Sequence, residues 1–409
     1  LRDYPVETLI RSKDKKGETG VHLVYKVKIM SFEKAFDVFL DAKTGEIVSK
    51  ISLMCNGDVP GTTFTSYYGI QAITCNHDIS SNLYGLEETG RNIKTYNATN
   101  WLGSGTWPPV GQNYLLSTTT HFPDPNSTTN IIISAAAGNV HWGMEKTYDF
   151  YLNTFARNSY DNQGGLIPQY INPPDLQGFG NTNNAYASSD GIVGGQTYMA
   201  YGLGDGVNST FWTALDIMGH EFTHNVVTFT AELIYESEHG ALNESFADIM
   251  GYAIKHATTG VTNWTIGEDL YVNASNPSSS ILRSMWNPNA MNNPDTYKGL
   301  HWANTWDLTF DAGGVHINSG VQNHWFFLLS EGGSGTNDNG DSYSVTGIGI
   351  SQAQQIAYRN HTTYLHSTSR FIDAYNGSLQ AAADLYGNPS SQYSAVQDAW
   401  AAVGVGIYC

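Results

Sequence analysis

The chain has 409 residues, of which 41% are hydrophobic and 14% are charged. This length exceeds what a single core usually organises and predicts two or three domains. The apolar runs are far too short to cross a bilayer, so no membrane partner is expected. Residues 1–50 carry a net charge of +2 and the remaining 359 carry −20. An acidic body without basic clusters excludes nucleic acid as a partner and favours a well-solvated surface.

The N-terminal segment differs from the rest of the chain in charge and in pattern. It contains three strand-like stretches, at residues 23–30, 35–41 and 47–54. A turn at residues 42–45 connects the last two, and its glycine is free to adopt a positive φ. The run from Asn56 to Gly61 is rich in turn-forming residues and lies close to the charge shift. We therefore expect a domain boundary and a processing site near residues 51–60.

The termini and the cysteines leave several questions open. The chain begins at Leu1 without a basic or apolar leader, so a secretory signal is absent from this stretch of sequence. Its three cysteines, Cys55, Cys75 and Cys409, permit one disulfide whose pairing the sequence does not reveal. Whether further domains follow Cys409 is equally open.

The remainder of the chain predicts a β-rich part followed by a helical part, an α+β organisation. Short strand-like runs fill residues 61–213, with one helix at 140–157. Helical periodicity then dominates, at residues 214–228, 243–256, 318–330 and 379–386. The Gly-rich tract at 332–341 favours a hairpin tip over a calcium loop, because it lacks the ordered acidic spacing of an EF-hand.

One predicted helix carries the pattern His-Glu-x-x-His. His220 and His224 are four residues apart and therefore lie one turn apart on the same helix face, where both imidazoles can reach one zinc ion. Glu221 is placed to take a proton from a metal-bound water. Two histidines on a helix are often only a satisfied pair, so this motif alone favours zinc modestly.

A second predicted helix strengthens the zinc interpretation. Glu244 follows His224 by 20 residues, and Asp248 lies one further turn along the same face. One carboxylate and two imidazoles leave a fourth zinc position open for water, as a catalytic site needs. Asp248 can accept the outer N–H group of a ligand histidine. The alternative, a local cap or salt bridge at Glu244, is disfavoured by the scarcity of basic residues nearby.

With these motifs the chain resembles the thermolysin family of neutral zinc metalloendopeptidases, including its bacillolysin- and vibriolysin-like members, from about residue 61 to 408. Several separated motifs occur in the family's order: His220-Glu221-x-x-His224, Asn243-Glu244-x-x-Ala247-Asp248, Leu282-Arg283-Ser284-Met285, Gly313-Gly314-Val315-His316-x-Asn318-Ser319-Gly320 and Ala401-Ala402-Val403-Gly404-Val405-Gly406. The resemblance implies a two-lobed zincin-type fold with a catalytic zinc in the cleft between the lobes.

The resemblance also implies roles for individual residues. Zinc would be ligated by His220, His224 and Glu244, with Glu221 as the general base. The oxyanion would be stabilised by Tyr235 and His316, and Asp311 would orient His316. Asp248 and Asn243 would support the zinc histidines.

Substrate contacts are implied in the same way. The Asn184 side chain and Ala185 main chain would bind the substrate backbone, and Arg283 would hold the carbonyl on the leaving side of the scissile bond. The residue after the scissile bond would enter an apolar pocket, which predicts cleavage on the amino side of large hydrophobic residues. The pocket positions are Ile217, Ile266, Leu270 and Leu282.

The chain departs from the family at two places. The positions of the family's double calcium site are Asp216, Lys255, Asn263, Thr265 and Glu268, of which only two remain acidic. The ammonium of Lys255 could replace the charge of the ion, so we expect the double site to be absent, with calcium elsewhere left open. A Gly-rich insertion between Ala185 and Met199 borders the predicted cleft.

The first residues resemble the C-terminal part of the family's PepSY-like propeptide, through Leu40-Asp41-Ala42-x-Thr44-Gly45-Glu46. This implies a secreted enzyme made as a zymogen, with its own propeptide as foldase and inhibitor and with protein or peptide substrates. A monomer is expected. The expected domains are a propeptide part at 1–56, an N-terminal lobe at 57–213 and a C-terminal lobe at 214–409.

Three other interpretations compete with this one. A gluzincin aminopeptidase has one residue less between histidine and glutamate, and its amino-terminus recognition motif is not found here. A metzincin needs a third histidine where this chain has Thr230. A zinc-stabilised binding protein would need neither Glu221 nor Tyr235 nor His316, and it would supply a fourth protein ligand in place of water.

Overall fold

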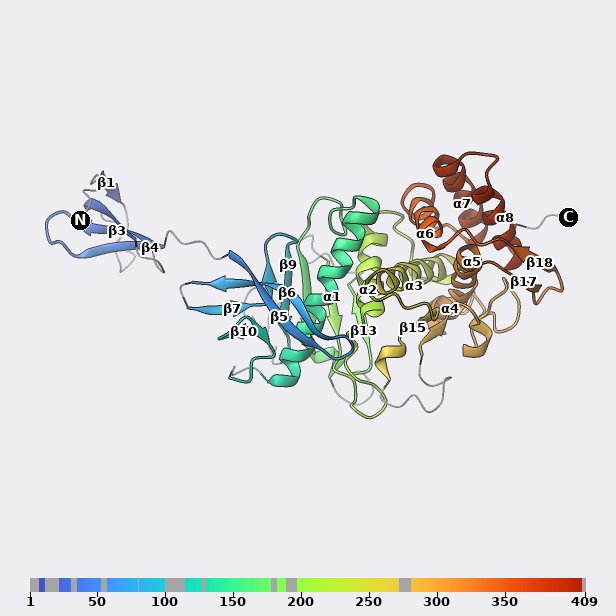
Figure 1. Ribbon diagram of the computed structural model, residues 1–409, viewed down its shortest axis with the longest axis horizontal. Helices are drawn as coiled ribbons and strands as arrows, with labels where there is room; N and C mark the ends of the chain where they lie inside the picture. Colours follow the sequence, from blue (N-terminus) through green and yellow to red (C-terminus); the bar gives the residue numbers. More distant parts are fainter. Residues whose placement is uncertain are drawn as a thin grey trace.

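The computed structural model describes residues 7–11, 22–30, 35–52, 57–79, 81–99, 115–126, 130–177, 182–188, 197–271 and 281–406. In Figure 1 the chain runs from a small N-terminal sheet through a β-rich lobe into a helical lobe. The α+β fold class and the predicted order of the two lobes are therefore confirmed. The Gly-rich insertion before Met199 and two of the three cysteines, Cys55 and Cys409, lie outside the described residues.

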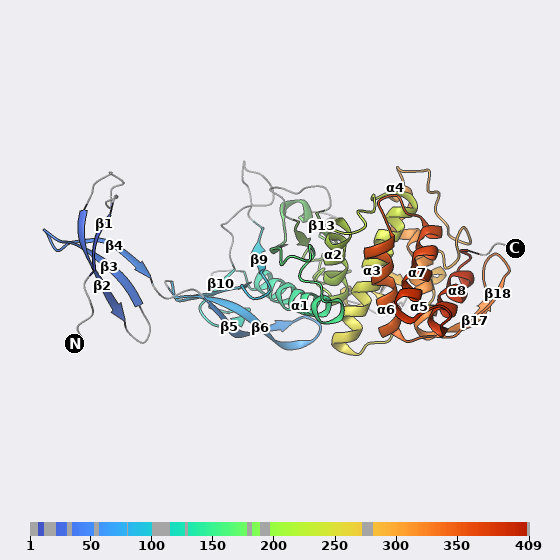
Figure 2. The ribbon, with the colours of Figure 1, turned by 90° about the horizontal axis from the view of Figure 1, so that it is seen from above.

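The N-terminal sheet is antiparallel and contains β1 (Glu7–Arg11), β2 (His22–Met30), β3 (Ala35–Asp41) and β4 (Ile47–Ser52), in that order. The three predicted strands correspond to β2, β3 and β4. Oδ1 of Asp41 accepts hydrogen bonds from the N–H groups of Lys43 and Thr44, and Gly45 has a φ of 73°, which together form the predicted turn. Figures 1 and 2 both place this sheet at the end of the molecule opposite the helical lobe.

Two five-stranded sheets form the β-rich lobe. The first has the order β10-β7-β6-β5-β11, from β5 (Gly57–Thr65), β6 (Gly69–Asp78), β7 (Leu83–Gly85), β10 (Leu116–Ser117) and β11 (His121–Phe122). The second has the order β13-β14-β12-β9-β8, from β8 (Glu87–Glu88), β9 (Ile93–Asn97), β12 (Ile167–Ile171), β13 (Ala185–Ala187) and β14 (Met199–Tyr201). Strand β13 is the terminal strand of its sheet in the described part of the chain, a position at which a further strand can be added.

The predicted turn at residues 56–61 is wrong for its described part. Residues 57–61 are the first half of β5 and pair with β6, Gly57 opposite His77 and Gly61 opposite Ile73. Pro60 is tolerated there because β11 reaches only Thr62 and Thr63, which leaves the other edge of β5 open at the proline. Gly61 is required by packing, since a β carbon would lie 2.6 Å from the carbonyl oxygen of Thr120.

Helix α1 (Ile131–Phe155) packs against both sheets and starts earlier than the predicted Val140. Its N-cap is Asn130, whose Oδ1 accepts the N–H of Ile132. Gly138 lies inside this helix, although a glycine in a helical pattern often marks an end. Here it permits close packing: a β carbon at Gly138 would lie 2.0 Å from Oγ1 of Thr63 on β5.

The helical lobe starts with α2 (Leu215–Thr228) and α3 (Ser237–Thr259), which surround the candidate site. The hairpin of β15 (Thr265–Ile266) and β16 (Arg283–Ser284) and the short α4 (Asp311–Asn318) follow. The remaining elements build the rest of the lobe: α5 (Gly320–Glu331), β17 (Gly333–Thr336), β18 (Ser342–Val345), α6 (Ile350–Arg359), α7 (Phe371–Tyr386) and α8 (Ser391–Ala402). Strands β17 and β18 form the predicted hairpin at the Gly-rich tract.

Helices α2 and α3 cross in close contact because each supplies a glycine. A β carbon at Gly219 would lie 3.0 Å from the α carbon of Gly251, and one at Gly251 would lie 2.3 Å from the carbonyl oxygen of Asp216. Gly251 of α3 packs beside the start of α2, whereas Asn243, earlier in α3, contacts His224 near the end of α2. The two helices therefore run antiparallel. This crossing brings the histidine face of α2 against the carboxylate face of α3.

Among the described residues, no helix is both long and apolar enough to span a membrane.

Candidate metal centre and active site

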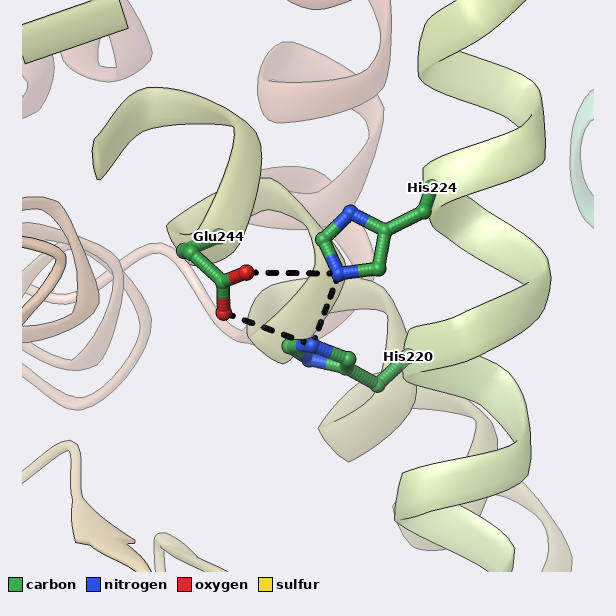
Figure 3. Close-up of side chains that lie close together, drawn as sticks. All are labelled: His220, His224 and Glu244. Carbon is green, nitrogen blue, oxygen red and sulfur yellow. Dashed lines mark hydrogen bonds and ion pairs between the residues drawn. The ribbon is translucent and has the colours of Figure 1, made fainter. Parts of the chain in front are cut away.

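Helix α2 presents the two histidines of the motif to one point. His220 and His224 are one turn apart, and their Nε2 atoms lie 2.9 Å from each other (Figure 3). The His220 residue is only 5% exposed. Two imidazole nitrogens at this distance repel each other unless a proton or a metal cation lies between them. The two Nε2 atoms are therefore placed to bind one cation or to share one proton.

Helix α3 supplies a carboxylate to the same point. One oxygen of Glu244 lies 3.4 Å from Nε2 of His220, and the other lies 3.4 Å from Nε2 of His224 (Figure 3). The potential ligand atoms of the three residues all lie within 4.8 Å of one another. Two imidazoles and one carboxylate are the donor set of a catalytic zinc site with an open fourth position.

The electrostatics of this group favour a cation. Burial disfavours charge on His220, but Asp248 and Glu244 outweigh it and raise the pKa of that imidazole to about 10. Burial would also raise the pKa of Glu244, yet the surrounding His316, His224 and His220 hold it well below its ordinary value. Oε2 of Glu244 is buried without a hydrogen-bond partner. A buried carboxylate whose two oxygens face two imidazole nitrogens fits a divalent cation such as zinc.

The outer nitrogens of both histidines are held by side chains of α3. Nδ1 of His220 lies 2.9 Å from Oδ1 of Asp248, and Nδ1 of His224 lies 2.8 Å from Oδ1 of Asn243. Asn243 accepts the Nδ1–H of His224, and Asp248 contacts Nδ1 of His220 as an ion pair, so that the Nε2 atoms of both rings are directed at the shared point. The two supporting residues expected from the sequence are thus in contact with the two histidines.

Asp248 is fully buried and has two further partners. Arg283 donates to its carboxylate from Nε and Nη2, both at 2.6 Å. Asn323 of α5 donates from Nδ2 at 2.8 Å and accepts from the hydroxyl of Ser245. Sequence reasoning assigned Arg283 to substrate only, and it missed Asn323 because no motif links α5 to the zinc helices. The expected substrate contact of Arg283 is not tested, but the structure gives this side chain a supporting contact.

Tyr235 and His316 converge on the carboxylate side of the centre. The Tyr235 hydroxyl donates to Oε1 of Glu244 and lies 3.0 Å from Nε2 of His316. Burial and Glu244 raise the pKa of Tyr235, so its phenol keeps its proton. The carboxylate of Asp311 accepts from the N–H of His316 and lies 2.6 Å from its Nδ1, which fixes the ring as the sequence predicted. Burial opposes charge on His316, but Glu244 and Asp311 raise the pKa of its imidazole.

One cavity of about 290 Å³ is lined by the three possible zinc ligands and Asn243, by Tyr235 and His316, by Glu221 of α2 and by β13. Burial raises the pKa of Glu221 to about 7, against the opposing effect of His220. Asn184 and Ala185, predicted to bind substrate backbone, line the same cavity. Strand β13 therefore borders the metal centre.

Three of the four positions of the predicted apolar pocket, Ile266, Leu270 and Leu282, lie close together around Gly267, whose N–H donates to Asp216 of α2. The Leu282 N–H donates to the carbonyl of Ile266, and a β carbon at Gly267 would touch both Leu282 and Leu270. Ile217, Ile266 and Leu270 are buried core residues, while Leu282 keeps partial exposure. None of the four lines the cavity around the metal centre. Their role in specificity remains a prediction.

A lysine occupies the centre of the group that corresponds to the family's double calcium site. Nζ of Lys255 lies 3.3 Å from Oδ2 of Asp216 and 3.0 Å from Oδ2 of Asp269, and it also donates to Glu268. The Lys255 residue is 1% exposed. Asn263 and Thr265 donate to the same Glu268 carboxylate. The ammonium of Lys255 thus lies between the carboxylates of this group, and the absence of the double calcium site stays a prediction.

A second buried group of possible metal ligands, Glu88, His141 and Glu145, lies in the β-rich lobe. Its polar atoms form hydrogen bonds with neighbouring protein groups. His141 donates from Nε2 to the carbonyl of Thr74 and contacts Oγ1 of Thr95 through Nδ1. Glu145 accepts the Thr74 N–H and hydrogen-bonds to the carboxyl of Glu88. With both histidine nitrogens engaged, this group does not fit a metal site.

Comparisons with known proteins agree with this geometry. The family models for the catalytic domain and the alpha-helical domain of thermolysin metallopeptidases match residues 61–228 and 231–405. A bacillolysin of Bacillus cereus is 36% identical over 333 residues, which cover 81% of this chain and 52% of the relative. A bacillolysin of Bacillus amyloliquefaciens is 34% identical, with 94% of this chain and 65% of the relative covered.

Among solved structures, the precursor of protealysin, a metalloproteinase from Serratia proteamaculans, superposes with a TM-score of 0.56 at 26% sequence identity. The match covers 76% of this chain and 87% of that one. The chain spans between about half and two thirds of the length of the curated relatives named above. The two family models, which between them cover nearly the whole of residues 61–405, show that the chain belongs to the thermolysin metallopeptidase family.

Proposed function

We propose that this protein is a secreted zinc endopeptidase that hydrolyses peptide bonds on the amino side of large hydrophobic residues. The observation that carries the proposal is the convergence of His220, His224 and Glu244 on one point, with Glu221 lining the same cavity. A structural zinc site needs four protein ligands and no general base. Here three ligands leave the fourth position to the cavity.

Zinc bound by these three residues would lower the pKa of a coordinated water and polarise the scissile carbonyl. Glu221 is the general base. A pKa of about 7 lets its carboxylate accept the proton of the attacking water near neutral pH and return it to the leaving amine. Tyr235 and His316 donate hydrogen bonds to the carbonyl oxygen as it gains negative charge. The edge of β13 holds the substrate backbone as an added strand.

The preference for large hydrophobic residues rests on the pocket of Ile217, Ile266, Leu270 and Leu282. All four are apolar, and Ile266 pairs with Arg283, whose N–H groups face Asp248 beside the metal centre. Partial exposure of Leu282 gives a side chain of the substrate access to this apolar group. Burial of a leucine or phenylalanine there contributes roughly 1.5–3 kcal/mol.

We also propose that the protein is made as a zymogen. Residues 1–56 would be the C-terminal part of a propeptide that assists folding and inhibits the enzyme, and residues 57–213 and 214–409 the two catalytic lobes. The sheet of β1–β4 is a unit of its own, separate from the sheets of the β-rich lobe. Its net charge, opposite to that of the acidic remainder, supports mutual attraction.

The double calcium site is proposed to be absent, with Lys255 in place of the ions. Nζ of Lys255 lies within ion-pair distance of three carboxylates and therefore takes the position that a cation between them would need. Zinc is then the one metal required for activity. The mature enzyme is expected to be a monomer.

A direct test assays the wild type after its own processing, and each variant after cleavage in trans by wild-type enzyme that is then removed, on a blocked peptide with leucine after the scissile bond. The Glu221→Ala variant should keep zinc and lose at least a thousandfold in kcat/KM, because it lacks the base while the ligands remain. Glu331→Ala, which removes an exposed glutamate at the end of α5, is the control and should match the wild type. Wild-type protein that binds zinc and cleaves neither this peptide nor casein would overturn the proposal in favour of a zinc-stabilised binding protein.

A further inference from the structure

Large apolar side chains are exposed in the segment that leads into α4. Trp306 is 91% exposed, Leu308 50% and Phe310 55%. A tryptophan with almost no contacts is costly to leave in water, and clustered exposed aromatics commonly mark a binding surface. We name residues 304–310 the aromatic loop.

The aromatic loop is held in place at both ends by residues of the active site. The hydroxyl of Ser237, two residues after Tyr235, donates to the carbonyl of Thr305 at 2.7 Å. At the other end, Phe310 directly precedes Asp311, which orients His316, and its carbonyl accepts the N–H groups of Gly313 and Gly314. Tyr235 and His316 thus each lie two residues from a residue that anchors the loop, Ser237 and Gly314 respectively.

Hydrogen bonds within the loop fix its shape. Phe310 donates its N–H to the carbonyl of Asp307, and Thr309 donates its hydroxyl to the Asp307 carboxylate at 2.6 Å. The N–H of Trp306 donates to Oδ1 of Asn304. These turns use the polar groups of the loop internally, so the apolar side chains are what it presents outward.

The position of the loop identifies which end of the cleft it borders. The pocket for the residue after the scissile bond lies near the start of α2, where the Gly267 N–H donates to Asp216. Helix α3 runs antiparallel to α2, so its first residue Ser237 lies beyond the opposite end, past His224. A peptide that fills the pocket and crosses the metal centre therefore extends toward the aromatic loop with its amino-side residues.

We propose that Trp306, Leu308 and Phe310 determine specificity by binding apolar side chains of the substrate on the amino side of the scissile bond. The inference rests on the proposed endopeptidase function and adds a second determinant to it, since a substrate is selected on both sides of the cleaved bond. Asp307 places negative charge within the loop, beside Trp306 and Leu308. Acidic residues on the amino side are therefore rejected, which sharpens the preference.

The test uses a series of blocked peptides with leucine fixed after the scissile bond and with phenylalanine, alanine or aspartate at each of the three amino-side positions. The wild type prefers phenylalanine over aspartate at one or more of these positions by about tenfold or more in kcat/KM. The double variant Trp306→Ser, Phe310→Ser loses this preference. It still cleaves a minimal peptide that carries only the blocking group there at the wild-type rate. Leu385→Ser, which removes an exposed leucine of α7, is the control and keeps the full preference.

The outcomes separate this inference from the proposed function. A wild type that cleaves none of the peptides refutes the endopeptidase function itself. Cleavage with an amino-side preference that the double variant retains refutes only the role of the aromatic loop. A double variant whose sole defect is lost binding to its own pro-segment, or to vesicles of phosphatidylcholine and phosphatidylglycerol, would also overturn it. Circular dichroism establishes that the variants are folded.

Discussion

The α carbon of Gly251 lies 3.0 Å from the position of a β carbon on Gly219, so that α2 and α3 cross at van der Waals contact. This one contact sets the distance between the histidines of α2 and the carboxylates of α3. The metal centre thus depends on residues that carry no functional group.

Gly251→Ala should separate the two helices. The new methyl group would lie 2.3 Å from the carbonyl oxygen of Asp216, and backbone cannot move aside as a flexible side chain can. Overpacking of this kind costs about 1–3 kcal/mol. We expect a lower melting temperature together with weaker zinc binding, measured by calorimetry and by competition with a chromophoric chelator. Gly90→Ala, where the nearest atoms are at 3.6 Å, is the control, and equal effects of both changes would contradict the account.

Asp248→Asn tests how the outer contacts support the centre. The change keeps the shape of the side chain but removes the charge that holds Nδ1 of His220 and the guanidinium of Arg283. Loss of such a partner typically lowers metal affinity by about 10- to 100-fold. Chelator competition would measure this, with the exposed Asp384→Asn as control. An unchanged zinc affinity would show that Asp248 serves only the packing around Arg283.

Calcium should not stabilise this protein through the site around Lys255. A calcium titration of the melting temperature, in the inactive Glu221→Ala background to prevent self-cleavage, should show no large saturable rise that depends on Asp216 or Glu268. Lys255→Glu should be destabilised without calcium, since it leaves buried carboxylates unpaired, at a cost of about 3–5 kcal/mol. Millimolar calcium should restore part of that loss. A calcium effect in the parent that Asp216→Asn abolishes would refute the prediction.

The buried carboxyl pair in the β-rich lobe predicts a pH dependence of stability. Burial raises the pKa of Glu145 from 4.5 to about 8, and burial raises the pKa of Glu88 as well, against the opposing effect of Arg91. The folded state thus holds a proton that the unfolded state has released above pH 4.5. The contribution of this proton to stability is complete at low pH and is lost as the pH rises through about 8.

Glu145→Gln should remove that dependence, because an amide reproduces the hydrogen bonds of the protonated acid at every pH. Relative to the parent, we expect the free energy of unfolding to fall less steeply, by up to about 1.4 kcal/mol per pH unit, between pH 5 and 8. Urea denaturation across this range measures it in the inactive background. Glu87→Gln removes a more exposed neighbour paired with Lys94 and is the control. If the free energy of unfolding changes with pH in the same way for the parent and for Glu145→Gln, the folded state does not hold a proton on this carboxyl pair.

Much of this site could be predicted because its chemistry is local in sequence. Four-residue spacing places His220 and His224 on one face of a helix, and the same period relates Glu244 to Asp248. The cluster at Lys255 was predicted only through the family resemblance, and its members do converge. The start of β5 before Pro60 and the start of α1 before Gly138 were not predicted. Both residues are accommodated by packing against segments distant in the sequence, which no local pattern shows.

The contacts that were not predicted share one cause. Asn323 reaches Asp248 from a helix 75 residues away, and Ser237 anchors Thr305 across 68 residues. Neither residue belongs to a recognisable pattern, since their partners are set by how α4 and α5 pack on α3. The exposure of Trp306 likewise follows from the path of the loop between its anchors, and composition alone would have placed that residue in the core.

X-ray absorption spectroscopy of zinc-loaded Glu221→Ala would test the central claim most directly. The account predicts one zinc per chain, ligated by two imidazoles and light oxygen or nitrogen atoms with an exchangeable solvent molecule among them, and loss of this zinc in Glu244→Gln. A zinc with four protein ligands, with a sulfur ligand, or with full occupancy in Glu244→Gln would contradict it. Such a result would make this a structural metal site, whatever the resemblance of the surrounding fold.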